Sequence, residues 1–282
     1  MKISKFSVAC LSAGALMAIS GLSWSAQEWS VATDYAPLSA GVTVSGVSNT
    51  GGVDDAASTA NNAALQTIQS ATWVGSYGGV FNADGCASGA YCDVGDLTGN
   101  APEHSIDNDQ RYDMALLSFT GLKKKITDVK IRWAQNDSDI SVLAYTGSGD
   151  PTANGNLFGK TYDLIKNLNG WTVIGNYANV CTGITGTNAA LGCGTNVAIN
   201  AGGVFSSYWL IGAYNPLAAG DAGYTTGAAG FDYVKLGAVT GCTSGDANCG
   251  QSAGTVPEPG SLALFGAALV GMISLRRRQQ RG

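Results

Sequence analysis

Apolar and polar residues alternate along the middle of the chain with the period of two that is typical of β-strands. Val129, Ile131 and Trp133 alternate with Lys130 and Arg132, so one side of this segment is expected to face a core. Short runs rich in apolar and aromatic residues recur at residues 114–119, 141–145, 171–177, 208–214 and 231–239. The pattern predicts a series of short strands.

Turn-forming residues separate these runs. They occur at residues 147–151, 167–170 and 215–216, where Gly, Asn, Asp, Ser and Pro cluster. Residues 161–168 are compatible with a short helix or a turn, and no long helical stripe or internal repeat interrupts the series. The sequence therefore predicts an all-β domain, a jelly-roll-like β-sandwich, over residues 71–241. Residues 27–70, polar and weakly patterned, are expected to form a separate N-terminal segment.

The N-terminus has the organisation of a secretory signal peptide. Lys2 and Lys5 precede an apolar run at residues 8–22, which the small residues Ser23 and Ser25 follow. A positive start, a short apolar helix and small residues near the cleavage site are the features that the secretion machinery reads. Residues 1–26 are therefore predicted to be a signal peptide, and the chain is expected to be exported.

The C-terminus combines an extended tripeptide, a short apolar segment and a basic cluster. Pro257, Glu258 and Pro259 precede the 15-residue apolar run 261–275, and the two prolines favour extended backbone. The run is shorter than the ~20 residues of a typical spanning helix, but a short helix can cross a thinned bilayer. The basic cluster follows the apolar run and consists of Arg276, Arg277 and Arg278. These residues are expected to remain on the cytoplasmic side of the membrane.

These C-terminal features closely resemble the PEP-CTERM sorting signal of Gram-negative bacteria, here placed at residues 256–282 after a linker at 242–255. The resemblance implies that an exosortase, a membrane cysteine protease, removes the tail. It also implies an inner-membrane precursor, held transiently by the C-terminal helix, that is then delivered to the cell surface or an extracellular matrix. Residues 101–108, 114–119, 137–145 and 207–214 are similar to segments of one group of such proteins, which carries no established activity to transfer.

Charge changes the picture of possible partners. The net charge of −5 includes two basic residues of the leader, four of the tail and one acidic residue of the tail. The central part keeps nine basic and 19 acidic side chains, a net charge of −10. An acidic surface with few lysines argues against nucleic acid as a partner. The 40 glycines follow no collagen period and fit a domain with many turns.

The cysteine spacing predicts disulfides. Of seven cysteines, Cys10 lies in the predicted leader. The other six form three close pairs, which are Cys86 and Cys92, Cys181 and Cys193, and Cys242 and Cys249. An even number in an exported chain favours disulfide-stapled loops, although six cysteines allow 15 connectivities and proximity alone does not fix the pairing. Zinc would need ligand spacings and histidines that this chain does not have.

Candidate catalytic residues are few. His104 is the only histidine, so a triad mechanism would depend on it, and no G-x-S-x-G turn accompanies it. A structural role for His104 in a turn with Asp107 is the favoured reading. Glu28 and Glu103 are the only glutamates between the leader and the tail. We expect no catalytic site and no enzyme activity, with a secreted hydrolase as an alternative that would require carboxylates to converge in a cleft.

Two oxygen-rich clusters could bind calcium. They contain Asp107 and Asp109 in one loop and Asp137 and Asp139 in another, and calcium takes six to eight hard oxygen ligands from such loops. Neither cluster has EF-hand spacing, and the alternative is that they form Asx-turns at strand ends. Calcium is the only cofactor that the sequence suggests, and its binding is not the favoured interpretation.

The aromatic residues leave two interpretations of the domain open. Trp73, Tyr77, Trp133, Trp171, Tyr208 and Trp209 could pack in the core or form a platform on which sugars stack. The leading hypothesis is a non-enzymatic surface or matrix protein associated with exopolysaccharide and biofilm. A carbohydrate-binding module is the alternative.

Overall fold

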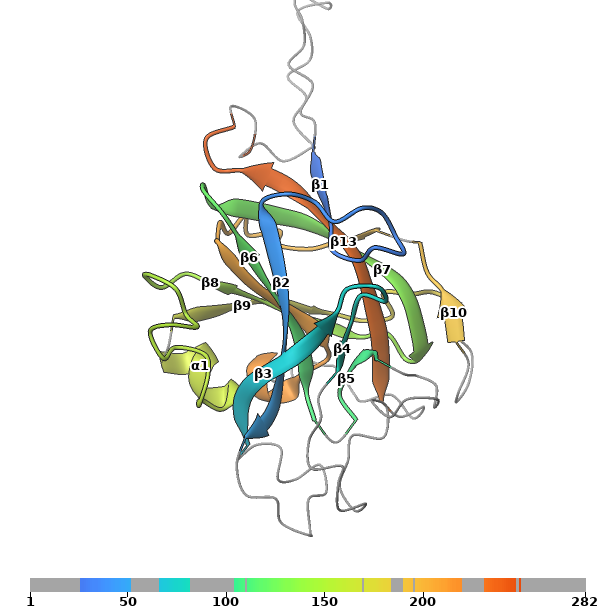
Figure 1. Ribbon diagram of the computed structural model, residues 1–282, viewed down its shortest axis with the longest axis horizontal. Helices are drawn as coiled ribbons and strands as arrows, with labels where there is room; N and C mark the ends of the chain where they lie inside the picture. The colour runs from blue at the N-terminus through green and yellow to red at the C-terminus, as the bar shows by residue number, and fades with distance from the viewer. Residues whose placement is uncertain are drawn as a thin grey trace, which may run out of the picture.

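The computed structural model describes residues 26–51, 66–81, 104–109, 111–168, 170–183, 190–194, 196–219, 231–246 and 249. The predicted sorting signal and all but the last residue of the predicted signal peptide, including their expected helices, lie outside this part of the chain. Within it, antiparallel strands form two sheets, with the long strands β7 and β13 side by side in one of them (Figure 1). The predicted all-β class is confirmed.

The first sheet has the order β1 (Gln27–Ser30), β13 (Asp232–Thr243), β7 (Lys124–Asn136) and β10 (Ala190–Gly192). Two further short strands join it, β11 (Asn196–Ala198) on β7 and β5 (Ile106–Asp107) on β13. The second sheet has the order β4 (Gly79–Phe81), β3 (Thr67–Val74), β2 (Val42–Gly51), β6 (Asp113–Phe119), β12 (Tyr208–Ala213), β8 (Ile140–Tyr145) and β9 (Trp171–Tyr177). Two short helices are present among the described residues, α1 (Tyr162–Leu168) and α2 (Pro216–Ala219).

The two sheets pack face to face around one apolar core. Leu117 and Trp209 from the second sheet lie in the same buried cluster as Val129 and Leu236 from the first. Each of these four side chains is fully buried. Removing this apolar surface from water supplies the main drive for the sheets to associate, and the arrangement is a β-sandwich.

The second sheet is also covered on its outer face. Leu116, Leu143 and Leu210 belong to a second buried cluster, together with Tyr162 and Ile165 of α1. Strand β8 is therefore buried at every residue, and β6 and β12 are nearly so. Double-sided burial explains why these strands read as continuous apolar runs, whereas the alternating pattern of β7 reflects one solvent-facing side.

The sandwich is larger than the predicted range 71–241. Strands β1 and β2 belong to the sheets, and Trp29 and Val47 lie in the two apolar clusters. Residues 27–70 look polar in the sequence because they are rich in small residues, and at Gly46 the small size permits close packing of neighbouring strands. A Cβ on Gly46 would lie 3.0 Å from the Ala71 carbonyl oxygen. The segment expected to stand apart thus forms part of the domain, and β13 continues past the predicted boundary to Thr243.

Two of the three predicted cysteine pairs are disulfides. Cys181 is bonded to Cys193 and Cys242 to Cys249, while Cys86 and Cys92 lie outside the described residues. Cys181 and Cys242 are buried, so these bridges fix loops onto the sandwich core. In the part of the chain that the structure describes, neither helix has the length and apolarity of a membrane span.

Candidate functional site

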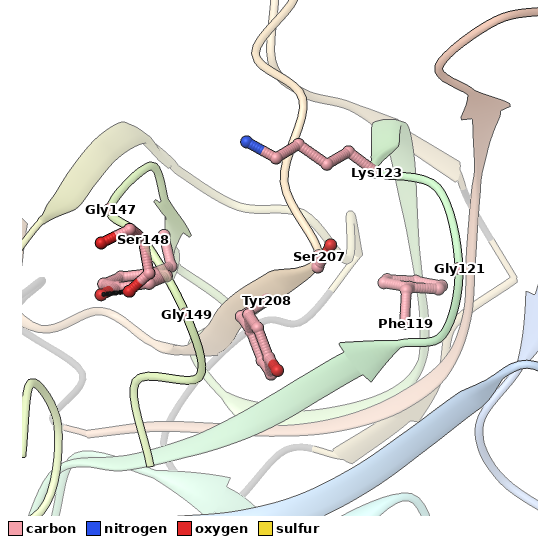
Figure 2. Close-up of a pocket in the computed structure, with 9 residues that line it drawn as sticks. Phe119, Gly121, Lys123, Gly147, Ser148, Gly149, Ser207 and Tyr208 are labelled. Atoms are coloured by element: carbon pink, nitrogen blue, oxygen red, sulfur yellow. Dashed lines mark hydrogen bonds between the residues drawn. The ribbon is translucent and has the colours of Figure 1, made fainter. Parts of the chain in front are cut away.

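A cavity of about 540 Å³ opens at one end of the second sheet. Its walls come from three places in the sequence: the β6–β7 turn, the loop after β8 and the start of β12 (Figure 2). The lining residues are Phe119, Gly121, Lys123, Tyr145, Gly147, Ser148, Gly149, Ser207 and Tyr208. The pairing of β12 with both β6 and β8 brings these segments together.

The wall formed by the loop after β8 is held by Tyr145. The Tyr145 hydroxyl donates to the Ser148 carbonyl at 3.0 Å and accepts from the amides of Asn154 and Asn156 at 3.2 and 2.8 Å. A Cβ on Gly147 would lie 2.6 Å from the Tyr145 ring, so only glycine lets the loop run against the ring. This wall is fixed before any ligand arrives.

Tyr208 and Lys123 contribute an aromatic ring and a cation to the lining of the cavity. Tyr208 is half-buried, and its ring meets that of Tyr145 edge to face with centroids 6.2 Å apart. Burial, followed by the nearby Asp150 carboxylate, raises the pKa of Tyr208 above its usual value, so the phenol keeps its proton at neutral pH. Lys123 is exposed and extends from the β6–β7 turn at the edge of the cavity (Figure 2). The described lining offers apolar faces, hydroxyl groups and one ammonium group, which suits binding of a polar ligand with an apolar face.

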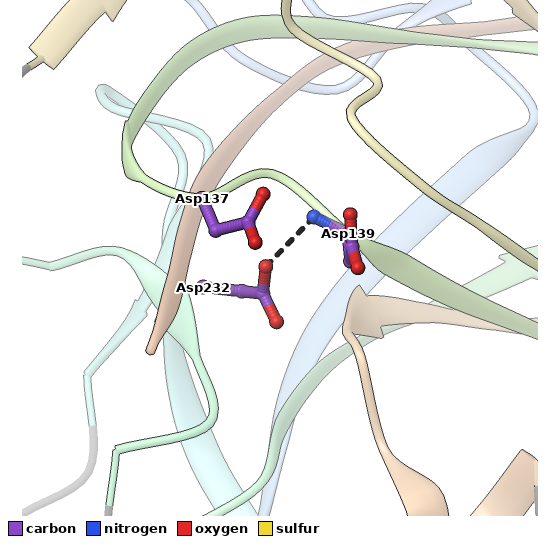
Figure 3. Close-up of side chains that lie close together, drawn as sticks. All are labelled: Asp137, Asp139 and Asp232. Atoms are coloured by element: carbon purple, nitrogen blue, oxygen red, sulfur yellow. Dashed lines mark hydrogen bonds between the residues drawn. The ribbon is translucent and has the colours of Figure 1, made fainter. Parts of the chain in front are cut away.

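A group of three carboxylates lies at another position, where β7 ends and β13 begins. Asp137 follows β7, Asp139 precedes β8 and Asp232 is the first residue of β13 (Figure 3). One oxygen from each lies within 4.8 Å of the others, and Asp139 and Asp232 are buried. The register that pairs Asp232 with Asn136 brings the three together.

Hydrogen bonds position Asp232 within this group. Its Oδ1 accepts from the Asp139 backbone N–H and its Oδ2 from the Asn108 amide, both at 2.7 Å. Burial nevertheless raises the pKa of Asp232 to about 8, outweighing these bonds, and the charges of Asp139 and Asp137 add to the rise. The pKa of Asp139 is raised too, mainly by burial. Either a proton on Asp232 or a bound cation would relieve this repulsion.

The structure brings together two of the four carboxylates that the sequence suggested for calcium. Asp137 and Asp139 converge, but the third member is Asp232, which the sequence reading did not single out. Asp107 instead accepts from the Asp109 backbone N–H at 3.1 Å, an Asx-turn, and Asp109 accepts from the Tyr233 hydroxyl at 2.8 Å. Only the pairing of β7 with β13 could have identified Asp232, since it lies 93 residues from Asp139.

The other candidate residues are dispersed. His104 lies against the rings of Tyr77 and Phe81, with centroids 5.9 and 5.4 Å away. Trp171 and Trp209 are core residues, so the aromatic residues do not form one sugar-binding platform. Exposed Tyr77 and half-buried Trp133 lie on either side of the Lys235 ammonium, which is 5.0 Å from each ring centre.

Comparison with known families bears on the C-terminal tail. The family model described as a PEP-CTERM protein-sorting motif matches residues 255–278, which include Pro257, Glu258 and Pro259. The chain carries a PEP-CTERM sorting motif. The motif confirms the resemblance seen in the sequence and marks an exported protein, made as a membrane-anchored precursor and sorted to the cell surface by an exosortase. No curated protein and no solved structure matches the chain.

Proposed function

We propose that the ectodomain is a non-enzymatic component of the cell surface or extracellular matrix, associated with exopolysaccharide in a biofilm. The observation that carries this proposal is the PEP-CTERM motif at residues 255–278, which ties the chain to export and surface delivery. The domain that the motif delivers is a sandwich with a net charge near −10 and two disulfides. Disulfides persist in oxidising compartments outside the cytoplasm, so they suit a protein that stays there.

The packing also supports a structural role. The central strands β6, β12 and β8 of the second sheet are buried on both faces. A fully packed sandwich of this kind resists local opening, because its central strands are held by apolar contacts on two sides. Such stability is useful to a protein that serves outside the cell as part of a matrix.

The test is the mass of the protein recovered from the envelope, the matrix and the medium of its native host. We expect a form that begins near Gln27 and ends near residues 257–259, enriched in the matrix fraction. Replacing Pro257, Glu258 and Pro259 by alanine should leave a precursor that keeps its tail in the inner membrane. Replacing Gln251 and Ser252 by alanine is the matched control and should leave sorting unchanged.

Two results would contradict the proposal. A matrix-free, freely soluble product in the medium would separate the protein from exopolysaccharide, although sorting itself would stand. Catalytic turnover of the host polysaccharide by the purified protein would contradict the non-enzymatic role.

A further inference from the structure

We propose that the end of the sandwich from which the C-terminal tail leaves is a docking surface for a membrane of anionic phospholipids. The surface is formed by residues 121–125, which we call the lysine turn. It comprises the β6–β7 turn and the first two residues of β7, with three consecutive lysines after an exposed leucine. The proposal concerns the membrane-anchored precursor that the sorting motif implies. It does not depend on a role in a matrix.

The chain leaves the domain directly beside the lysine turn. The end of β13 pairs with the start of β7, and the Ser244 backbone N–H donates to the Lys123 carbonyl at 2.8 Å. Residues 250–260 separate Cys249, the last residue that the structure describes, from the apolar run of the tail. These 11 residues span at most about 40 Å when fully extended. An anchored tail therefore keeps this end of the domain close to the membrane.

The turn combines an apolar side chain with unpaired positive charge. Leu122 is 61% exposed, the highest value among the exposed large apolar residues that the structure describes. Lys123 is exposed, and Lys124 and Lys125 are half-buried. None of the three lysines forms an ion pair in the described part of the chain. This combination suits a bilayer interface, because a leucine can enter the headgroup region while the ammonium groups stay at the phosphates.

Two aspartates also lie at this end, and hydrogen bonds hold both within their own loops. Asp150 follows β8, and its Oδ1 accepts from the Thr152 backbone N–H and hydroxyl at 2.8 and 2.7 Å. Its carboxylate also interacts with Tyr208. Asp246 follows β13, and its Oδ2 accepts from the Thr243 backbone N–H at 2.8 Å. The three lysines outnumber these two carboxylates, so the lysine turn keeps a positive charge.

The opposite end of the sandwich is acidic, where β7 ends and β13 and β6 begin. Beside the single arginine Arg111, six aspartates lie there, three of them drawn in Figure 3: Asp107, Asp109, Asp113, Asp137, Asp139 and Asp232. Strand β7 has 13 residues, so roughly 40 Å separates this group from the lysine turn. That distance exceeds the Debye length of about 8 Å at physiological salt. A domain docked through the lysine turn therefore holds most of these carboxylates away from the negative charge of the membrane.

The experiment measures amide hydrogen exchange in the full-length precursor, reconstituted in lipid nanodiscs. One set of discs contains phosphatidylcholine alone, and the other contains equal parts of phosphatidylcholine and the anionic lipid phosphatidylglycerol. We expect exchange within residues 121–125 to be about fivefold slower on the anionic discs, the effect of at least one lysine attracted to such a surface. The difference should disappear at about 1 M salt, where the Debye length is about 3 Å.

The test variant replaces both Lys123 and Lys125 by glutamine, because Lys124 already donates to a hydroxyl of β13 at 3.0 Å. In this variant, exchange on the anionic discs should come within about twofold of the value on neutral discs. The matched control replaces Lys160 and Lys166 by glutamine. It removes the same charge from residues outside the lysine turn, so it should keep the full protection.

A third variant, Leu122→Ser, tests the apolar contact. It should reduce the protection on anionic discs by about threefold, as expected for a leucine that is partly removed from water. The urea unfolding midpoint of each variant should equal that of the native protein, because the replaced side chains lie at the surface. The comparison between the two kinds of disc uses the native sequence, so it tests the surface even where a variant folds poorly.

Three results would overturn the proposal. The first is equal exchange of the native lysine turn on both kinds of disc. The second is an equal loss of protection from the two pairs of lysine substitutions, because the effect would then be one of total charge. The third is protection by soluble polygalacturonate on neutral discs that Leu122→Ser leaves unchanged, since this would assign the surface to an anionic polymer instead of a lipid membrane.

Discussion

The buried Asp232 carboxyl group predicts a loss of stability as the pH rises. Its pKa is about 8 in the folded protein and 3.8 for the unperturbed side chain. Between these values the folded state holds a proton that the unfolded state has released, so folding is favoured most at low pH. The stabilisation is complete below about pH 4, is lost progressively as the pH rises through the folded pKa, and changes no further above it.

The expected slope follows from one proton. Each pH unit within this window changes the free energy of unfolding by about 1.4 kcal/mol. Between about pH 5 and about pH 7 the contribution of Asp232 therefore falls by roughly 2–3 kcal/mol. Burial raises the pKa values of Asp109 and Asp139 as well, so these two groups change the stability in the same direction as Asp232.

The perturbation that isolates this contribution is Asp232→Asn. The amide cannot ionise, so the dependence of stability on pH should be shallower in the variant than in the native protein by about 1.4 kcal/mol per pH unit. Its absolute stability should also fall, by about 1–3 kcal/mol, because the new amide faces the Asn108 amide, donor against donor. The diagnostic quantity is therefore the slope and not the stability at one pH.

The assay is urea unfolding followed by tryptophan fluorescence, at intervals between about pH 5 and about pH 8. Asp163→Asn is the control for loss of one carboxylate, since the Asp163 side chain is 61% exposed and should leave the slope nearly unchanged. Parallel profiles for native protein and Asp232→Asn would refute the reasoning. Repeating the series with about 1 mM calcium tests the calcium hypothesis, because binding to the ionised group of carboxylates should stabilise the protein at high pH and little at low pH.

Two further predictions concern stability. Replacing Cys181 and Cys193 by serine should lower the free energy of unfolding by about 3 kcal/mol, from the 12-residue separation of the two cysteines. Native protein treated with a reductant serves as the comparison. If neither the serine variant nor the reduced protein has a lower unfolding midpoint than the native protein, the disulfide does not stabilise the fold. Leu210→Ala and Ile211→Ala should each cost about 2–5 kcal/mol in urea unfolding, because these neighbours point to opposite faces of β12 and both faces are buried. A small effect for either one would show that its face of the sheet is exposed.

Much of this protein could be read from local sequence. The strands at residues 114–119, 171–177 and 208–214 were predictable because apolar and aromatic runs between turn residues specify strands without reference to the rest of the chain. The two disulfides join cysteines only 12 and 7 residues apart, as the close spacing of the candidate pairs favoured without fixing the connectivity. The sorting motif is a linear signal that its enzyme reads directly, so it needed no fold to be recognised.

The sequence did not predict that the central strands of the second sheet are buried on both faces. The apolar run of β8 would look the same whichever partner its second face contacted. The structure shows that residues of α1 and α2 pack in the cluster on that face. The membership of residues 27–51 in the sandwich was also missed. Glycine and serine there look like a linker, yet they are the residues that permit the close packing of Gly46 against Ala71.

The two candidate sites depended wholly on tertiary structure. Asp232 joins Asp137 and Asp139 because β13 returns antiparallel to β7 in a particular register, and a register is set by the packing of whole faces. Lys123, Tyr145 and Tyr208 meet at the cavity because β12 inserts between β6 and β8. The sequence by itself determined the all-β class, several of the central strands and the sorting motif of this protein. Long-range strand pairing alone decided which side chains face one another, because no local pattern encodes contacts between residues so far apart in the chain.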